Sequence, residues 1–373
     1  MIYFDNAATT FPKPKKVLEA VQECLKHYCG NPGRSSHRLS VKSGEEIYLA
    51  REAVSTFFGI DAPERVVFTH NATDALNMAI KTTVEENSSV IISDIEHNAV
   101  IRPLAKLKKT KGVIYSEYDS DNDIEEEFKK LSHAKPNCII SNVTSNVTGK
   151  SIDLKKLSSV RAQLNVPLIL DASQAAGHLK INAKNTPFDI ICAPAHKSLF
   201  GIQGCGFIIF ADDRYRESFI EGGSGSESIS TEMPQELPER FEAGTAAVAS
   251  IVALRHGIEF INSIGLSEIS KKLSSLNERA YEILSSFKTF NIISEGNGIT
   301  SFYSDKLPSY AISNELDKYG ICTRSGLHCA PSVHRKLGTL KNGTVRLSFS
   351  FFNSTSELDT FYKRMKAIAK TLL

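Results

Sequence analysis

The chain contains 373 residues, of which 41% are hydrophobic and 23% are charged. This length exceeds that of one compact domain, so we expect one large domain and a smaller one. A formal net charge of +2 leaves no electrostatic footprint for nucleic acid. No apolar run reaches the roughly 20 residues that span a bilayer.

The seven cysteines are scattered and odd in number, which does not suit a disulfide framework. Residues 1–6 have neither the basic nor the apolar region of a signal peptide. We therefore expect a cytoplasmic protein that binds neither membrane nor nucleic acid. Cys138, Cys192 and Cys205 lie in apolar runs and are interpreted as inert core residues.

Between residues 65 and 210, apolar runs typical of buried strands alternate with amphipathic stretches typical of helices. The predicted strands are residues 65–69, 90–93, 112–115, 137–141, 166–170, 189–192 and 206–210, and the predicted helices are residues 73–83, 100–109 and 154–163. Near-continuous apolar strands separated by helices indicate an α/β fold, with a mostly parallel central sheet covered by helices. Ligands bind at the carboxyl ends of such strands, and the polar clusters of this chain fall there.

Residues 221–245 interrupt this alternation with a glycine- and serine-rich stretch of little periodicity. Segments of this kind inside a domain are usually functional or disordered. Helical patterns over residues 246–261 and 266–287 follow, and then short elements typical of an α+β unit. We place the domain boundary at residue 246, with residues 16–245 as the large domain and residues 246–373 as the small C-terminal domain.

Lys197 follows an apolar strand and stands beside His196, while Asp171 ends a neighbouring apolar strand. A carboxylate at the end of a buried strand needs a partner, and a protonated pyridine nitrogen suits it. A Schiff-base lysine with an acidic partner for the pyridine nitrogen is the equipment of enzymes that use pyridoxal phosphate (PLP). The alternative is a surface lysine after a strand, which the flanking His196 and Gly201 disfavour.

Further polar residues follow the predicted strands. Residues 71–73 join a strand to a helix, so this helix N-terminus could bind a phosphate, although Asn71 or Thr73 could instead be a helix N-cap. The chain has no Walker A or dinucleotide-binding glycine motif, which makes a nucleotide a poor source of that phosphate. His97 could stack on a cofactor ring or be a polar loop residue, and Asn146 could be a turn residue.

Cys329 is the second reactive candidate, because a proline two residues later suits the first turn of a short helix. A thiol beside a helix N-terminus, with Arg324 and His328 close in sequence, is expected to have a lowered pKa. The alternative is a zinc site of His328, Cys329 and His334, which lacks a second cysteine pair at ligand spacing. We therefore expect no metal.

Two more side chains could contact a ligand. Arg346 lies in a predicted apolar strand, and its planar guanidinium group could bind a substrate carboxylate with two hydrogen bonds. A structural salt bridge is the alternative for this arginine. Gln174, three residues after Asp171, could reach another polar atom of a cofactor ring.

Taken together, these segments resemble the cysteine desulfurases of the NifS/SufS kind, within the class V aminotransferase group of fold-type I PLP enzymes. The resemblance covers nearly the whole chain, and its ordered set of motifs is specific although no single motif is. The motifs are residues 3–10, 31–37, 241–245 and 324–331, together with His97, Asn146, Asp171, Gln174, His196, Lys197 and Arg346. The compact Arg-x-Gly-x-His-Cys-Ala form of residues 324–330 resembles the SufS-like branch.

The resemblance implies a role for each of these residues. Lys197, Cys329 and His97 would be catalytic, with Lys197 carrying PLP and His97 stacking on its ring. Asn146, Arg324 and Arg346 would bind the substrate, with Arg346 on its carboxylate. Residues 1–15 would form an arm near the active site. The implied cofactor-binding residues are Ala72, Thr73, His97, Asn146, Asp171, Gln174, His196, Lys197 and, from the other subunit of a homodimer, Thr245.

The implied reaction converts L-cysteine to L-alanine. Lys197 would remove the Cα proton, and the Cys329 thiolate would attack the substrate sulfur. A persulfide would remain on Cys329 for the thiol of a sulfur-acceptor protein, with a link to iron–sulfur cluster assembly.

Three residues depart from the pattern of this family. Pro194 stands where Ser or Thr usually donates to the phosphate, Ala195 replaces a usual Gly, and Ile202 replaces a usual Pro. These departures leave open a selenocysteine lyase or another class V aminotransferase or lyase, and also a non-catalytic sulfur carrier that kept the fold. Cys329 favours the desulfurase, because simple transamination needs no nucleophilic thiol.

Overall fold

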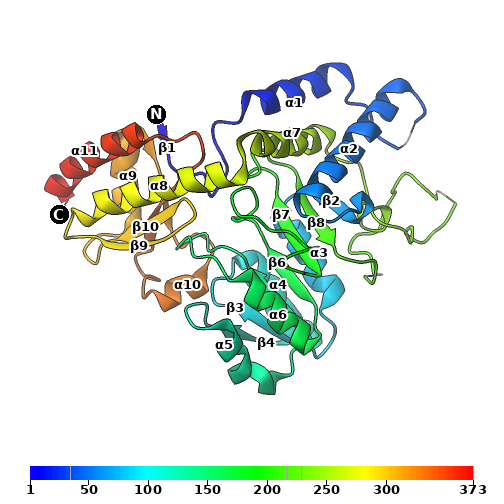
Figure 1. Cartoon of the computed structure of the whole chain (residues 1–373), viewed down its shortest axis with the longest axis horizontal. Helices are drawn as coiled ribbons and strands as arrows, with labels where there is room; N and C mark the ends of the chain where they lie inside the picture. The colour runs from blue at the N-terminus through cyan, green and yellow to red at the C-terminus, as the bar shows by residue number, and fades with distance from the viewer. Residues whose placement is uncertain (34, 216, 228, 373) are drawn as a thin grey trace.

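The computed structural model describes residues 1–33, 35–215, 217–227 and 229–372. Its large domain is built on a seven-stranded sheet in the order β2-β8-β7-β6-β5-β3-β4 (Figure 1). The predicted α/β fold is confirmed, and all seven predicted strands are present with ends shifted by a few residues. They are β2 (Val66–Thr69), β3 (Ser89–Ser93), β4 (Ile114–Tyr118), β5 (Cys138–Asn142), β6 (Leu168–Asp171), β7 (Ile190–Pro194) and β8 (Gly206–Phe210).

The sheet is parallel from β7 through β4, whereas β8 runs antiparallel to both β7 and β2. The cause lies in the connection between β7 and β8, residues 195–205, which contains no helix. A return to a parallel strand needs a longer crossover, usually a helix. This connection carries Lys197, so the lysine lies at the carboxyl end of β7.

Helices cover both faces of the sheet and meet alternate side chains of the strands. Ile92 packs in one core cluster with Leu76 and Leu104, whereas its neighbour Ile91 packs in a second cluster with Leu157. This period of two, with both faces apolar, is what fully buried strands require. The covering helices are α3 (Ala72–Thr83), α4 (Asn98–Lys111), α5 (Ile124–Leu131) and α6 (Leu154–Leu164), with 3₁₀ turns at Pro63–Arg65, Ser132–Ala134 and Glu239–Phe241.

Two long helices lead from the large domain toward the small one. Helix α7 (Val248–Ile264) packs against α1 (Lys15–His27) and α2 (Arg38–Phe57), whereas α8 (Leu266–Ser285) packs against strands of the small domain. Gly265, with a φ of 92°, separates α7 from α8. Both helices had been predicted. The proposed domain boundary at residue 246 stays a prediction.

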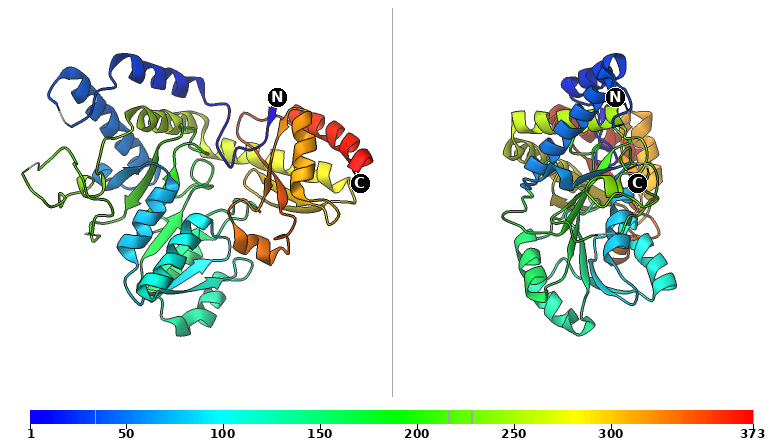
Figure 2. Two further views of the ribbon diagram at one scale, coloured as in Figure 1. Left: turned by 180° about the vertical axis from the view of Figure 1, so that it is seen from behind. Right: turned by 90° about the vertical axis from the view of Figure 1, so that its right-hand side faces the viewer.

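The small domain is a four-stranded antiparallel sheet in the order β12-β13-β10-β9, covered by helices (Figure 2). Its short helix α10 follows Cys329 and begins at Pro331, the proline that was expected in its first turn. The elements are β9 (Asn291–Gly296), β10 (Ile299–Tyr303), α9 (Ser309–Lys318), β11 (Ile321–Cys322), β12 (Arg324–Gly326), α10 (Pro331–Lys336), β13 (Thr344–Ser348) and α11 (Thr355–Leu372).

The N-terminal segment joins the two domains. Strand β1 (Ile2–Tyr3) pairs in parallel with β11, and Asp5 forms an isolated bridge with Ser348 at the end of β13. The chain then passes to the large domain, where the Thr10 hydroxyl donates to the Lys197 carbonyl at 2.6 Å. Residues 2–10 therefore contact both the small domain and the connection that carries Lys197. The arm of residues 1–15 stays a prediction.

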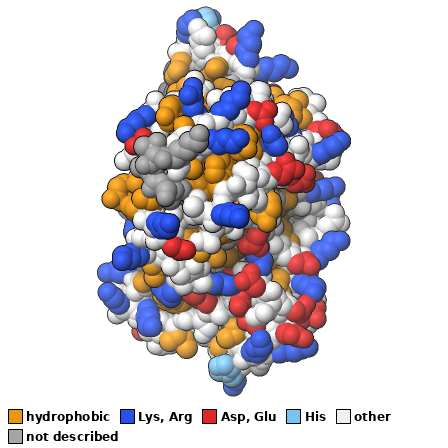
Figure 3. Space-filling model, turned by 90° about the vertical axis from the view of Figure 1, so that its left-hand side faces the viewer, with side chains coloured by type: hydrophobic (Ala, Val, Ile, Leu, Met, Phe, Trp, Pro, Cys, Tyr) orange, Lys and Arg blue, Asp and Glu red, His pale blue; other side chains and the backbone are white. Residues whose placement is uncertain are grey.

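Among the described residues, none of the helices combines the length and the apolarity needed to cross a lipid bilayer. On the face of the molecule shown in Figure 3, basic and acidic side chains both occur among apolar ones, as expected for a formal net charge of +2.

Candidate active site

The carboxyl ends of the parallel strands surround a cavity of about 180 Å³. Asp171 ends β6 and Asn142 ends β5, while His97 and Lys197 follow β3 and β7. The structure thus brings together eight of the nine residues predicted to bind the cofactor. The cavity is lined by Asn71, Ala72, Thr73, Leu76, His97, Ala99, Asn142, Asn146, Asp171, Ser173, Gln174, Pro194, His196 and Lys197.

The surroundings of Lys197 make its amine easier to deprotonate than that of an ordinary lysine. Burial, together with the positive charges of Arg346 and Arg324, lowers the pKa of Lys197 to about 8, against an opposing effect of Asp171. An unprotonated amine is nucleophilic, so this environment favours reaction with a carbonyl. The backbone of this connection is fixed by Thr10 and by Lys13, whose Nζ donates to the His196 carbonyl at 2.8 Å.

His97 is both a helix cap and a wall of the cavity. Its Nδ1 accepts a hydrogen bond from the Ala99 amide at 3.0 Å, at the N-terminus of α4. The proton of the neutral ring is therefore on Nε2. Burial lowers the pKa of His97 to about 4, with Asp171 opposing and Lys197 adding to this effect. A neutral, fixed imidazole in this wall can stack on an aromatic ring.

The N-terminus of α3 forms another side of the cavity. Asn71 is the N-cap, since its side chain accepts from the Asp74 amide at 2.9 Å, and Ala72 and Thr73 line the cavity. Gly206 of β8 permits this arrangement: a Cβ there would lie 2.5 Å from the Asn71 carbonyl carbon. The exposed backbone N–H groups and the helix dipole suit a phosphate.

The residues present fit PLP, and the unsatisfied buried atoms support this fit. The Nδ1 atom of His196 is buried and has no hydrogen-bond partner among the described residues. Burial lowers the pKa of His196 to about 4, so its ring is a neutral donor or acceptor beside the α3 N-terminus. Pro194 lines the cavity but has no N–H to donate, so this departure removes one donor from the phosphate side.

Arg346 is fully buried and lies where both domains meet. Its Nη2 donates to Asp5 Oδ1 at 2.8 Å and its Nη1 donates to the Asn146 carbonyl at 3.0 Å. Arg346 thus forms a structural salt bridge with Asp5, which was the alternative to binding a substrate carboxylate. The Nε of Arg346 is buried without a partner within the described ranges, which leaves a donor for a ligand.

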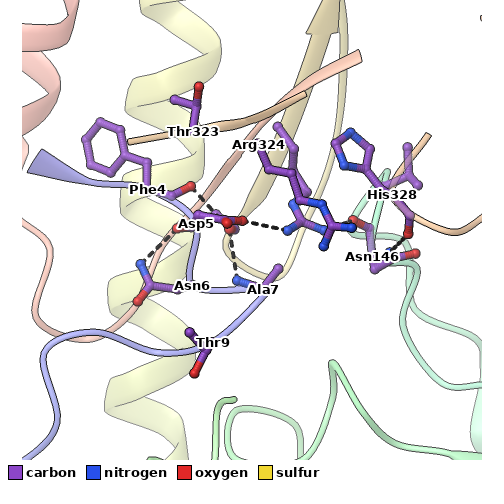
Figure 4. Close-up of polar contacts among 12 residues, drawn as sticks. Phe4, Asp5, Asn6, Ala7, Thr9, Asn146, Thr323, Arg324 and His328 are labelled. Atoms are coloured by element: carbon purple, nitrogen blue, oxygen red, sulfur yellow. Dashed lines mark hydrogen bonds and ion pairs between the residues drawn. The ribbon is translucent and has the colours of Figure 1, made fainter. Parts of the chain in front are cut away.

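Cys329 is exposed and lies at the rim of the site. The Asn98 amide donates to its carbonyl at 2.8 Å, and the Asn146 side chain donates to the His328 carbonyl at 2.6 Å (Figure 4). The Arg324 Nη2 lies 3.9 Å from the Cys329 sulfur. His328 and Cys329 both have positive φ, 49° and 60°, a conformation unusual for residues other than glycine and often found at functional sites.

The zinc alternative finds no support in the geometry. His328 Nε2 contacts the Thr344 hydroxyl at 2.9 Å, and His334 Nδ1 contacts the Thr339 hydroxyl at 2.7 Å. Within the part of the chain that the structure describes, no group of three or more His, Cys, Asp or Glu side chains is placed to hold a metal ion.

Four predicted site residues do not line this cavity, namely Thr245, Arg324, Cys329 and Arg346. Thr245 lines a second cavity of about 270 Å³ with Arg51 and Glu242, and Lys197 is not among the residues that line it. Its assignment to the site of another subunit stays a prediction. Arg34, part of the motif at residues 31–37, lies outside the described residues.

Sequence patterns alone indicate no individual role for Asp5, Glu96 or Lys336. Asp5 pairs with Arg346, and Glu96 is a buried carboxyl beside His97 that accepts from the Asn142 amide at 2.6 Å. Lys336 pairs with three carboxylates of the large domain. Glu96 could have been noticed, because a charged residue in the short segment after a buried strand and beside a candidate histidine needs a partner if it is buried.

Comparison with known protein families places nearly the whole chain in one of them. The model for aminotransferase class-V matches residues 2–361. The chain belongs to this family. PLP is the cofactor of its members.

Individual relatives agree with this placement. A probable cysteine desulfurase of Pyrococcus abyssi is 29% identical over all of this chain and 95% of its own length. A probable cysteine desulfurase of Borreliella burgdorferi is also 29% identical, over all of this chain and 92% of its own. A solved apo cysteine desulfurase from Thermococcus onnurineus superposes with a TM-score of 0.91, at 28% identity over all of this chain and 95% of that one.

Proposed function

We propose that this class V enzyme is a PLP-dependent cysteine desulfurase in which Cys329 receives the sulfur. The observation that carries the proposal is the position of Cys329. Its segment is hydrogen bonded to Asn98 and Asn146 at the rim of a cavity that holds Lys197 and Asp171. A transaminase needs the lysine and the aspartate but has no use for a thiol fixed at this rim.

Bound PLP supplies an electron sink that makes the Cα–H and Cβ–S bonds of an amino acid easier to break. The chain's own residues bind and orient the reactants. Asp171 would pair with the pyridine nitrogen, Gln174 with the ring oxygen, and the α3 N-terminus with the phosphate. Arg346 would bind the substrate carboxylate through donors that include its free Nε. Lys197 Nζ would move the proton at Cα.

Sulfur transfer then follows from the position of the thiol. The Cys329 thiolate attacks the substrate sulfur, so that an S–S bond forms as the Cβ–S bond breaks. The electron pair of the broken bond stays with Cβ, which takes a proton, and the product is alanine. The Nη2 atom of Arg324 lies 3.9 Å from this sulfur.

The proposal extends to the cellular location, the sulfur acceptor and the oligomeric state. All seven cysteines are free, which suits a reducing, cytoplasmic location. Cys329 is exposed, so that its persulfide could be passed to the thiol of an acceptor protein, as iron–sulfur cluster assembly would require. Thr245 does not line the Lys197 cavity of its own chain, which favours a homodimer in which it completes the partner's site.

Two variants test the function. Cys329→Ser should keep the cofactor absorbance and lose alanine and sulfide production by more than about 100-fold, because the nucleophile is gone. Lys197→Ala should lose the absorbance of the lysine-bound cofactor. Cys29→Ser is the matched control, since Cys29 is also free and exposed. Normal sulfide release by Cys329→Ser would contradict the proposal.

A further inference from the structure

The carboxylate of Asp5 lies against the guanidinium to which the proposed function assigns the substrate carboxylate. The Asp5–Arg346 ion pair is 2.8 Å long, with Arg346 fully buried and the Asp5 side chain only 22% exposed. Figure 4 shows Asp5 beside Asn6 and Ala7 on the N-terminal segment, and Arg324, Asn146 and His328 on other segments of the chain. An acidic residue at this position opposes the binding of an anion, so its presence needs an explanation.

The backbone around Asp5 is fixed independently of this ion pair. The Asn6 amide donates to the Ser348 carbonyl, the Ala7 amide donates to the Ser348 hydroxyl at 2.9 Å, and the Asn6 side chain donates to the Ser348 carbonyl at 2.9 Å. Gln174 donates to the Ala7 carbonyl at 3.0 Å. The segment can therefore hold Asp5 in place without help from Arg346.

The balance of charge offers the explanation. Arg324 and Arg346 are opposite each other in the β12–β13 pair, so their side chains lie on the same face of the sheet. Burial lowers the pKa of Arg346, with Asp5 opposing and Arg324 adding to the effect. Arg324, Arg346 and Asp5, counted alone, carry two positive charges and one negative charge, an excess of one positive charge. One substrate carboxylate neutralises that excess.

We propose that Asp5 sets the charge of the subsite formed by Arg346 and Arg324, and so restricts the enzyme to amino acids with a single carboxylate. The inference rests on the proposed role of Arg346 as the substrate-carboxylate residue. A second carboxylate on the ligand would bring a net negative charge into a buried site. Without Asp5, the second guanidinium charge is free to receive it.

The test compares L-aspartate with L-asparagine, which differ in one charge and hardly in shape. Their dissociation constants are measured from the change in cofactor absorbance of the PLP-loaded protein, for the wild type, Asp5→Asn and the control Asp61→Asn. Asp61 pairs with Lys184 at an exposed site. Any displacement of Arg346 in Asp5→Asn weakens both ligands, and the ratio of their dissociation constants cancels it.

In Asp5→Asn, the preference for aspartate over asparagine should rise by about tenfold or more, the order expected for one unit charge near a buried site. Asp61→Asn should leave the ratio unchanged. An unchanged ratio in Asp5→Asn, or aspartate binding too weak to detect in that variant, would overturn the proposal. The readout needs no turnover, so a wild type that binds amino acids but yields no alanine would refute the desulfurase assignment alone.

Discussion

Lys336 and Asp94 form an ion pair between the two domains, with the ammonium 2.6 Å from the carboxylate. The same ammonium contacts Asp119 and Asp121. The Ser332 hydroxyl donates to Glu117 at 3.0 Å. These contacts attach α10, which follows Cys329 directly, to the loops and strand of the large domain. The thiol is therefore positioned by a helix held from both domains.

Replacing Lys336 by methionine should disturb sulfur transfer without removing the cofactor. The variant Lys336→Met leaves three carboxylates without their shared cation, so α10 should sample other positions. We expect kcat for alanine formation to fall by about tenfold, or about 1.4 kcal/mol in the barrier. The cofactor absorbance should stay as in the wild type, because the cavity around Lys197 is unchanged.

The exposed Lys184, which pairs with Asp61, provides the control Lys184→Met. High salt should lower the activity of the wild type more than that of Lys336→Met, since the partly exposed ion pairs are screened. Equal activity of Lys336→Met and Lys184→Met would show that α10 needs no such attachment.

The reactivity of Lys197 should report its environment. In cofactor-free protein, only the unprotonated amine reacts with a trace of acetic anhydride. A pKa lowered to about 8 by burial should give half-maximal labelling near pH 8. Since Asp171 opposes the lowering, Asp171→Asn should move the midpoint to lower pH. Peptide mapping of exposed lysines in the same sample is the reference, and a midpoint above pH 10 would contradict the prediction.

Glu96 should make stability fall as the pH rises. Burial is the main cause that raises the pKa of Glu96 to about 8 from 4.5. Between these values the folded protein keeps a proton that the unfolded chain releases, so the free energy of unfolding decreases through this window. From pH 5 to pH 9, Glu96→Gln should gain about 2–4 kcal/mol relative to the wild type.

Denaturant melts of Glu96→Gln at several pH values check this expectation. The control Glu282→Gln removes an exposed carboxylate that pairs with Arg279. A constant difference between Glu96→Gln and the wild type across the range would mean that Glu96 is already ionised in the folded protein.

Gly206→Ala should weaken cofactor binding. The added Cβ would lie 2.5 Å from the Asn71 carbonyl carbon and 2.9 Å from the Ala72 nitrogen, and both are backbone atoms that cannot rotate away. The N-terminus of α3 must then shift from its place in the cavity. We expect PLP affinity to fall by about tenfold or more, measured by absorbance titration. Unaltered affinity would indicate that this helix end does not hold the phosphate.

The residues that follow parallel strands could be predicted from the sequence. Asp171, His97 and Lys197 each come after an apolar run, and parallel strands bring their carboxyl ends to one edge. The physical rule needs only local patterns, and the structure places all three in one cavity. The short helix after Cys329 could also be predicted from local sequence, because a proline occupies its first turn.

Contacts between distant segments could not be predicted in this way. The pairing of Asp5 with Arg346 and of Lys336 with Asp94 depends on how the two domains lie together, and no periodicity encodes that. The antiparallel direction of β8 also escaped notice, although the absence of a helix from residues 195–205 could have indicated it.

The pairing of the first strand with residues near position 321, and of Asp5 and Asn6 with strand β13, has a consequence for synthesis on the ribosome. Residues 2–6 are synthesised long before residues 321–348, with which they pair. The large domain can begin to form earlier from its neighbouring strands. A nascent chain interrupted before residue 344 would therefore lack strand β13, and Asp5 and Asn6 would have no partners there. Chaperones or proteases would recognise such an unpaired segment.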